Sequence, residues 1–283
     1  MLLLLSPIAS LTKDISSLIK EFLRLFSLSR SAKSELAPPT LPDDRRIYVV
    51  GDIHGRLDCL DDLLGQILRD RIGFDGPVEY IFLGDLVDRG PDSRGVIQRL
   101  LDLSRADTLV RFLLGNHEEV MLMALHGDRT AMQLFDRIGG VATTLSYGIN
   151  TVTYHAMTDE EKIETLNSMI PAEHLDFLSG FEDRIAVGDY RFVHAGIRPG
   201  IPFESQARSD LRWIRGEFLM HKLPFEGMIV HGHTVTDEVE YRINRIGIDT
   251  GAFKSGRLTC LVLERASQRL LQTALAVDPQ YMD

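Results

Sequence analysis

Five short segments of the chain carry side chains that bind metal ions or move protons. They are GDIHG at 51–55, GDLVDRG at 84–90, GNHE at 115–118, HAG at 194–196 and HGHT at 231–234. Carboxylate, amide and imidazole donors without a thiol among them suit Mn, Fe, Zn or similar divalent ions. Two ions ~3.5–4 Å apart need a shared ligand, which a carboxylate can supply, and they lower the pKa of a bound water. The segments therefore predict a two-metal site whose hydroxide attacks phosphorus in line.

The first three segments each follow a predicted strand. Apolar runs at 47–50, 80–83 and 109–114 are separated by stretches whose leucines and isoleucines repeat with helical period. This β-α-β-α-β-α alternation predicts a mainly parallel sheet covered by helices. Sites in such sheets form outside the carboxyl ends of the strands. We therefore expect the side chains that end these strands to converge, with the glycines allowing tight turns; they are Asp52, His54, Asp85 and Asn116.

The second half of the chain has a different pattern. Residues 127–180 contain helix-start signals but no strong strand, so they are predicted to form a helical insertion beside the site. Gly188-Asp189 lies between two apolar segments and predicts a β-hairpin. Further strands are expected at 228–232, 245–249, 258–264 and 270–276, which makes this half richer in antiparallel strands.

The N-terminal region is predicted to be separate from this domain. Its first apolar run is shorter than the ~20 residues that span a bilayer. Residues 1–28 are expected to form a segment with an amphipathic helix over about 8–28, followed by a Ser- and Pro-rich linker at 29–44 and a domain at 45–283. The helix would pack on the domain or on a second copy of the chain, or lie on a membrane surface as a peripheral anchor.

Composition limits the class of protein. The 283 residues are 44% hydrophobic and 25% charged, as in ordinary globular proteins and unlike disordered or fibrous chains. The net charge of −10 argues against a nucleic-acid partner, whose phosphates a binding protein must neutralise. Cys59 and Cys260 are expected to be buried free thiols in a reducing compartment, with a single disulfide as the alternative, and this predicts a cytoplasmic protein.

The glycine-rich segments resemble a known family. GDIHG, GDLVDRG and GNHE, in this order and spacing, resemble the signature blocks of the phosphoprotein-phosphatase branch of calcineurin-like metallophosphoesterases. The later WIR, HGHT and IDTGAFKSGRLTCLVL are most similar to bacterial and phage-lambda-type serine/threonine protein phosphatases. The resemblance covers about residues 45–265. It implies an α/β (α+β) fold in which helices flank a β-sandwich and a βαβαβ core carries the signature blocks.

The resemblance also implies a role for each site residue. Asp52 and His54 would bind the first metal ion, Asp85 would bridge both, and the second ion would be held by Asn116, His194 and His233. His117 would be the general acid, oriented by Asp88, and Arg89 and Arg215 would hold the phosphate. The two divalent ions are expected to be Mn²⁺, with Fe, Zn, Ni or Co as alternatives.

Chemistry supports these assignments. An alkoxide is a poor leaving group, so a nearby imidazolium kept charged by a carboxylate assists its departure. The planar guanidinium of arginine donates two parallel hydrogen bonds to phosphate.

Three functions remain open from the sequence. The first is a phosphatase that hydrolyses phosphoserine, phosphothreonine or phosphotyrosine in proteins, or a small phosphoester. The second is a dinucleoside-polyphosphate hydrolase of the diadenosine tetraphosphate type, in which GNHD is usual where this chain has GNHE. The third is an inactive binding module, against which stands the presence of every expected ligand and of His117.

The remaining candidates receive simpler interpretations. His231 and His233 lie two residues apart on a predicted strand, so their side chains are expected to face the same side of the sheet. His231 is expected to be a packing or ligand-supporting residue. Trp213 is expected to be a core anchor, and Arg198 and Arg212 are candidates to touch substrate. Surface or core positions without a chemical role are expected for the other histidines, which are His126, His155, His174 and His221.

Overall fold

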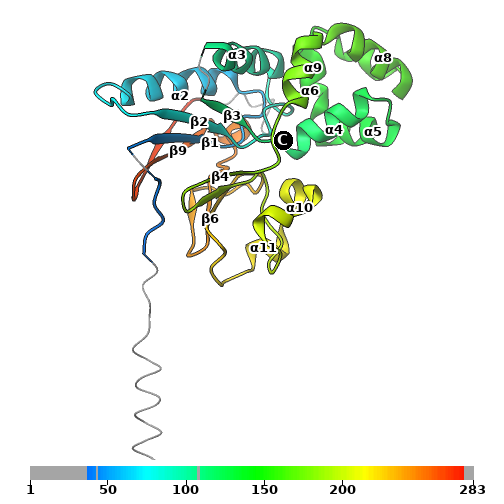
Figure 1. Ribbon diagram of the computed structural model, residues 1–283. Coiled ribbons are helices and arrows are strands. Elements are labelled where there is room, and N and C mark those ends of the chain that lie inside the picture. Colours follow the sequence, from blue (N-terminus) through cyan, green and yellow to red (C-terminus); the bar gives the residue numbers. More distant parts are fainter. Residues whose placement is uncertain (1–36, 43, 107–108, 277–283) are drawn as a thin grey trace, which may run out of the picture. The chain divides into compact units, whose positions relative to one another are not determined.

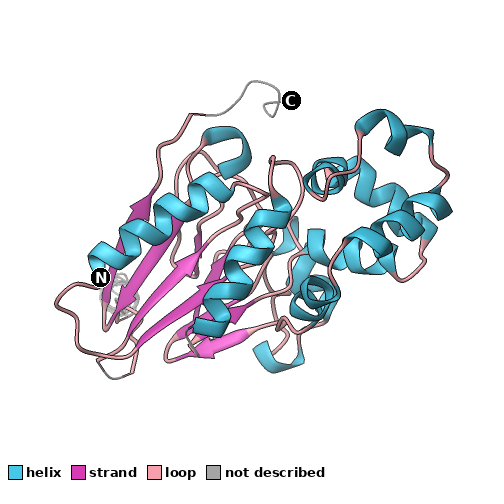
Figure 2. Cartoon of the chain, turned by 90° about the horizontal axis from the view of Figure 1, so that it is seen from above, coloured by secondary structure: helices cyan, strands magenta, loops and turns pink. Residues whose placement is uncertain are grey.

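Two five-stranded sheets form the centre of the protein (Figures 1 and 2). The computed structural model describes residues 37–42, 44–106 and 109–276. In the first sheet the order is β10-β9-β1-β2-β3, and in the second it is β4-β5-β6-β8-β7. The first sheet consists of β1 (Arg46–Val50), β2 (Val78–Phe82), β3 (Val110–Phe112), β9 (Thr259–Glu264) and β10 (Ser267–Gln272). The second consists of β4 (Ile185–Val187), β5 (Tyr190–Phe192), β6 (Met228–His231), β7 (Glu240–Tyr241) and β8 (Arg245–Gly247).

Strand direction in the first sheet agrees with the predicted alternation. β1, β2 and β3 are parallel, with Val50 opposite Phe82 and Phe82 opposite Phe112. β9 pairs antiparallel with β1, and β10 with β9. In the second sheet the predicted hairpin at Gly188-Asp189 joins the antiparallel strands β4 and β5. β5, β6 and β8 are parallel, so three further carboxyl ends lie side by side.

Alternating residues of β1 explain why the two sheets form a sandwich. Ile47 and Val49 pack with Phe192 and Val230 of the second sheet, whereas Tyr48 and Val50 belong to the core on the opposite face. Side chains of successive strand residues point to opposite faces, so a strand apolar at every position is buried on both. Helices cover the second face of the first sheet; they are α2 (Leu57–Asp70) and α3 (Ser93–Ala106).

The segment predicted to be a helical insertion is helical. Five helices follow α4 (Asn116–Leu125) and gather at one end of the sheets (Figure 1). They are α5 (Arg129–Ile138), α6 (Gly140–Ser146), α7 (Thr151–Ala156), α8 (Asp159–Met169) and α9 (Ala172–Ser179). Shorter elements are η1 (Phe203–Ser205), α10 (Arg208–Trp213), α11 (Gly216–Leu219) and α12 (Ala252–Ser255).

The end of the predicted linker packs on the domain. Leu41 is buried between the sheets, and its N–H donates to the carbonyl of Arg265 at 2.9 Å. The predicted N-terminal helix and most of the linker lie outside the described residues. Within the described residues, no helix is long and apolar enough to cross a membrane. Cys59 and Cys260 are buried free thiols, as predicted.

Candidate metal centre and active site

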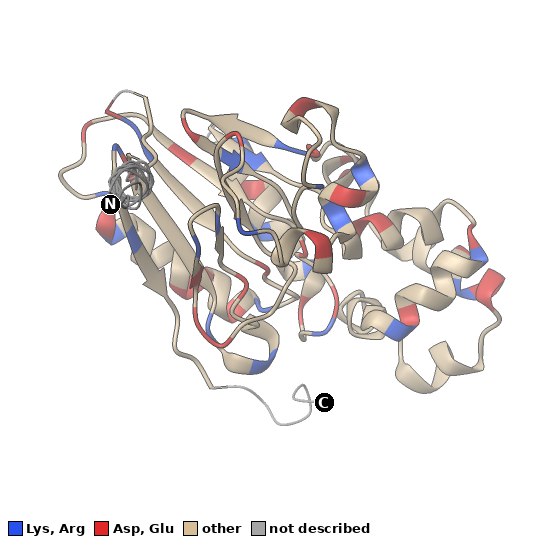
Figure 3. Ribbon diagram, turned by 90° about the horizontal axis from the view of Figure 1, so that it is seen from below, with Lys and Arg blue, Asp and Glu red and all other residues tan. Residues whose placement is uncertain are grey.

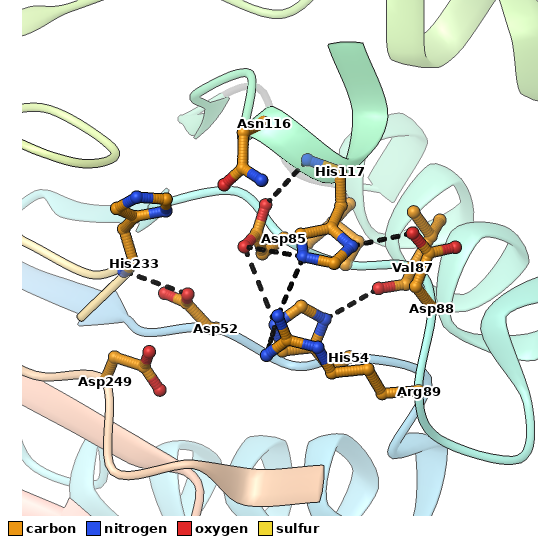
Figure 4. A network of polar contacts seen from close by, with 12 residues as sticks. Asp52, His54, Asp85, Val87, Asp88, Arg89, Asn116, His117, His233 and Asp249 are labelled. Carbon is orange, nitrogen blue, oxygen red and sulfur yellow. Dashed lines mark hydrogen bonds and ion pairs between the residues drawn. The ribbon is translucent and has the colours of Figure 1, made fainter. Parts of the chain in front are cut away.

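Loops at the carboxyl ends of five strands bring the predicted site residues together (Figure 4). Asp52 and His54 follow β1, Asp85 follows β2, and Asn116 begins α4 after β3. From the second sheet, His194 follows β5 and His233 follows β6. All six side chains are buried, and no more than 6% of any of these residues is exposed.

Two groups of donor atoms share the carboxylate of Asp85. In one group, atoms of Asp85, His194 and His233 lie within 4.8 Å of one another; in the other, atoms of His54, Asp85 and His117 do. Asp85 Oδ1 is 3.4 Å from His194 Nε2, and its Oδ2 is 3.6 Å from His54 Nε2. Asn116 Oδ1 is 3.0 Å from the same His194 nitrogen. Asp85 is therefore the one residue placed to serve both groups.

Asp52 lies at the edge of this arrangement. Its Oδ2 accepts the N–H of His233 at 2.9 Å, while its buried Oδ1 has no hydrogen-bond partner within the described residues. His233 Nε2 is likewise buried without a partner there. Buried polar atoms without a partner cost free energy unless a ligand satisfies them. Together with the oxygen and imidazole donors, these atoms fit a divalent cation.

Backbone carbonyls set the tautomers of two histidines. Nδ1 of His54 is 2.8 Å from the carbonyl of Val87, and Nδ1 of His194 is 2.8 Å from that of Leu83. A carbonyl only accepts, so each Nδ1 carries the proton and each Nε2 presents a lone pair to Asp85. Burial lowers the pKa of both imidazoles, and this keeps them neutral, the form that binds metal.

The Nδ1 atom of His117 contacts a carboxylate, whereas that of His54 and of His194 contacts a carbonyl. Its Nδ1 is 2.7 Å from Asp88 Oδ2, and its Nε2 is 3.8 Å from Asp85 Oδ2. Burial by itself would lower the pKa of His117, but the carboxylates of Asp85 and Asp88 outweigh it and raise the pKa above its ordinary value. Its Nε2 can therefore hold a proton at the centre of the site.

The two predicted phosphate-binding arginines lie on different sides of the centre. Arg89 is half-buried against the ring of Phe253, with its guanidinium carbon 4.7 Å from the ring centroid. Its Nη1 and Nη2 are 3.1 and 3.0 Å from Nε2 of His54 and His117. Arg215 is exposed, with Nη1 3.4 Å from Thr234 Oγ1. Arg89 thus borders the His54 side of the centre, and Arg215 contacts the loop that carries His233.

The backbone of the site is strained. Six residues other than glycine have positive φ within the described part, and five belong to the site: His54, Asp85, Asp88, Arg89 and His233. Such conformations cost free energy and concentrate at functional sites. Two glycines serve close approach rather than turning, because a Cβ at Gly115 would collide with Asp85 Oδ1 and one at Gly232 with Asp52 Oδ1.

Glu118 is a site residue that the sequence reasoning did not single out. Its fully buried carboxylate accepts the N–H groups of Asp85, Leu86, Val87 and Gly115 at 2.7–3.2 Å. Burial and the charge of Asp85 raise the pKa of Glu118 to about 7. The signal was present, since a Glu at the third position of a helix caps its N-terminus.

Asp249 is a second such residue, and Figure 4 shows it on the side of Asp52. It follows β8, and its Oδ1 accepts the N–H of Gly251 at 2.9 Å. Burial, followed by the charges of Asp249 and Asp85, raises the pKa of Asp52, and burial raises the pKa of Asp249 to about 6. Ile248-Asp249-Thr250-Gly251 ends a strand just as the first three segments do, which was the available signal.

The prediction for Trp213 was wrong. The residue is 37% exposed, its Nε1 donates to Glu119 Oε2 at 2.6 Å, and its ring centroid is 6.4 Å from that of His233. It lies at the rim of the site because α10 ends there. The guanidinium of Arg198 pairs with Asp210 and Glu217.

Arg212, the other candidate to touch substrate, also lies in ion pairs. Its guanidinium contacts the carboxylates of Glu119 and Asp183. His231 packs against Phe218, as expected for a packing residue. β6 ends at His231, and His233 has a φ of 62°, which is not a strand conformation. The expectation that both side chains face the same side of a strand therefore does not apply.

The fold and the site define a metal-dependent phosphoester hydrolase. Residues 45–237 match the family described as calcineurin-like phosphoesterase, so the chain belongs to that family, as the sequence motifs indicated. Its fold and its shared donor groups agree with this membership.

Characterised relatives differ in substrate. The chain is 28% identical to "Serine/threonine-protein phosphatase 2" of Escherichia coli (strain K12), over 76% of this chain and 91% of that protein. It is 26% identical to "Bis(5'-nucleosyl)-tetraphosphatase PrpE [asymmetrical]" of Anoxybacillus flavithermus, over 75% and 88%. Among solved structures, a putative diadenosine tetraphosphatase superposes with a TM-score of 0.58 at 20% identity, covering 84% of this chain and 100% of that one. The comparisons thus give the family and leave the substrate open.

Proposed function

We propose that the protein is a protein phosphatase that hydrolyses phosphoserine and phosphothreonine, and also phosphotyrosine. The observation that carries the proposal is the pair formed by His117 and Asp88, which leaves Nε2 of His117 3.8 Å from Asp85 Oδ2 and 3.0 Å from Nη2 of Arg89. An alkoxide leaves poorly unless it is protonated, so a phosphomonoester of serine needs such an acid. We expect the substrate to be a cytoplasmic phosphoprotein or a small phosphoester, and we expect no nucleic-acid partner.

Six side chains at this centre would hold two divalent ions, with Mn²⁺ as the first choice and Fe, Zn, Ni or Co as alternatives. Asp52, His54 and Asp85 would hold the first, and Asp85, Asn116, His194 and His233 the second. When bound, such ions lower the pKa of a coordinated water and neutralise charge on the phosphate. The negative charge of Asp85, shared between both ions, would offset part of their positive charge.

The remaining residues would bind the phosphate and move the proton. Arg89 and Arg215 would donate hydrogen bonds to non-bridging phosphate oxygens from opposite sides. A hydroxide derived from water would form the new bond to phosphorus, in line with the bond that breaks. The leaving oxygen would keep the electron pair of the broken bond and take the proton from His117 Nε2. The ionised Asp88 stabilises the imidazolium before transfer and keeps its ring aimed at the leaving oxygen.

A dinucleoside-tetraphosphate hydrolase is the alternative function. The names of the Anoxybacillus relative and of the superposed structure favour it. The bond cleaved there is a phosphoanhydride, whose leaving phosphate departs far more easily than an alkoxide. A general acid such as His117, paired with Asp88, therefore accelerates hydrolysis of the ester more than hydrolysis of the anhydride.

Side-by-side turnover of the purified full-length chain tests the proposal. The protein is treated with a chelator, reloaded with Mn²⁺ and given phosphoserine peptides or diadenosine tetraphosphate. We expect chelation to abolish turnover, Mn²⁺ to restore it, and kcat/KM to be higher for the peptides. Preference for diadenosine tetraphosphate would establish the alternative, and inactivity with every divalent ion would refute both.

A further inference from the structure

The carboxylate of Asp88 lies in a closed network of hydroxyl groups. Asp88 is fully buried; its Oδ2 faces His117, and its Oδ1 accepts the hydroxyl of Thr143 at 2.7 Å. The N–H of Asp88 donates to Thr143 Oγ1 at 2.9 Å and to Ser93 Oγ at 3.0 Å. The two hydroxyl oxygens are 2.8 Å apart. Ser93 and Thr143 are themselves fully buried, so no solvent competes for these bonds.

Counting donors fixes the direction of every bond in this network. An ionised carboxylate only accepts, so the single hydroxyl proton of Thr143 points to Asp88 Oδ1. Thr143 Oγ1 then accepts from the backbone N–H of Asp88, and the proton between the two hydroxyls belongs to Ser93. Asp88 has a φ of 72°, a strained conformation that these bonds over-determine.

Thr143 comes from the helical insertion, on α6, whereas Asp88 follows β2. A second contact joins the loop after β2 to the start of α6. The N–H of Arg89 donates to the carbonyl of Gly139, which precedes α6, at 3.1 Å. A Cβ at Gly139 would also collide with the side chain of Arg89. The insertion is thus attached directly to the residues that orient the acid and bind the phosphate.

We propose that Thr143, supported by Ser93, is a positioning residue that keeps Asp88 ionised and aimed at His117. The inference rests on the proposed role of His117 as general acid. Without the Thr143 hydroxyl, one buried carboxylate oxygen would lose its donor, and the ionised form of Asp88 would become costly. The ring of His117 would then be less well oriented for proton transfer, although the fold and the proposed metal ligands would be intact.

The chain offers a matched control one residue away. Thr144 is equally buried on the same helix, but its hydroxyl donates to the carbonyl of Gly140 in that helix at 3.1 Å. Thr143→Val and Thr144→Val remove the same atom at the same depth, and only the first change reaches Asp88. Thr143→Ser keeps the hydroxyl and loses only a methyl group.

Leaving-group dependence separates positioning from a general structural role. Turnover of a phosphoserine peptide needs a proton donor, whereas the leaving group of 2,4-dinitrophenyl phosphate departs without one. For Thr143→Val we expect kcat on the peptide to fall about tenfold or more, with little change in KM or in kcat on the dinitrophenyl ester. Thr143→Ser and Thr144→Val should behave like wild type. Equal losses on both substrates, or failure of Thr143→Ser to restore turnover, would overturn the proposal.

Two further measurements keep the test decisive. If Thr143→Val does not fold, Ser93→Ala, which removes the donor to Thr143, should show the same leaving-group dependence at smaller size; an equal loss on both esters would contradict the inference. The Nδ1–H proton resonance of His117 reports its bond to Asp88 without any substrate. We expect Thr143→Val to shift it and Thr144→Val to leave it unchanged. Wild-type inactivity on all phosphomonoesters would refute the proposed function, whereas an unshifted resonance would refute the inference alone.

Discussion

Three buried histidines of the site differ chiefly in the group that their Nδ1 atom contacts. The Nδ1 atoms of His54 and His194 face neutral carbonyls, whereas that of His117 faces the carboxylate of Asp88. A carbonyl fixes the tautomer and leaves Nε2 free as a ligand. A carboxylate also favours the protonated ring, so that Nε2 can carry a proton. Histidines of one site thereby differ in role: His54 and His194 are suited to bind metal as neutral rings, and His117 is suited to carry a proton.

Replacing His117 by asparagine tests the acid directly. For His117→Asn we expect kcat on a phosphoserine peptide to fall about 10²–10⁴-fold, because general acid catalysis contributes about that factor. Steady-state kinetics and metal analysis of the same preparation check this. Metal content should be unchanged, since the proposed ligands remain, and unchanged turnover would remove His117 as the acid.

Asp85 should be indispensable for a different reason. It is the one carboxylate shared by both donor groups, so Asp85→Asn should remove metal and activity together. Asp61→Asn is the control, because Asp61 lies in an exposed ion pair with Arg99. Elemental analysis and kcat measure both effects; an Asp85→Asn protein that keeps two ions per chain would contradict the shared-ligand proposal.

At the scale of elements, a partly buried cluster of charged side chains joins α2 to the first sheet. Asp70, the last residue of α2, accepts hydrogen bonds from Arg46 and Tyr48 of β1 and from Arg269 of β10. Burial by itself would raise the pKa of Asp70, but Arg269 and Tyr48 outweigh it and the pKa lies below its ordinary value. This cluster holds the end of α2 against the strands whose opposite ends carry the site.

Asp70→Asn should therefore destabilise the protein in a pH-dependent way. The depressed pKa adds stability above the unfolded value of about 3.9 and loses it as pH falls through the folded pKa. At pH 7 we expect a loss of about 1.5–3 kcal/mol in the free energy of unfolding, shrinking toward zero below pH 4. Urea titrations across this range measure it. A pH-independent difference would contradict the argument, and the exposed Asp61→Asn should cost less than about 1 kcal/mol.

At the scale of the whole molecule, the site exists only because two sheets pack together. β1, β2 and β3 supply one set of side chains, and the loops after β5 and β6 supply His194 and His233 from the other sheet. A hydrophobic cluster between the sheets, which includes Leu41, holds them together. Basic and acidic residues are interspersed along the elements drawn in Figure 3.

Truncations at two positions should separate chemistry from stability. Deleting residues 1–36 removes no site residue, so kcat on a phosphopeptide should be unchanged. Deleting 1–44 also removes Leu41, whose burial contributes about 1.5–3 kcal/mol, and should lower Tm by roughly 3–10 °C. Thermal unfolding of both proteins tests this, and equal Tm values would show that residues 37–44 contribute nothing. Recovery with lipid vesicles and the oligomeric state, compared with the full chain, test whether residues 8–28 bind membranes or a second copy.

The sequence by itself determined the local features of this protein. Strands, the hairpin at Gly188-Asp189 and the helical insertion follow from short-range periodicity and turn chemistry, which neighbouring residues decide. The gathering of Asp52, His54, Asp85 and Asn116 also follows, because adjacent parallel strands end at one edge of a sheet. Motif order added His194, His233, His117 and the arginines.

Only the tertiary structure decided which groups complete the site. Thr143 reaches Asp88 across 55 positions of sequence, and Asp249 approaches Asp52 from the other sheet. Trp213 is exposed and not part of the core, because it is the last residue of α10, which ends at the rim of the site. A hydrogen bond depends on the position and direction of two side chains, which are set by how helices and sheets pack. Periodicity along the chain carries no information about that packing.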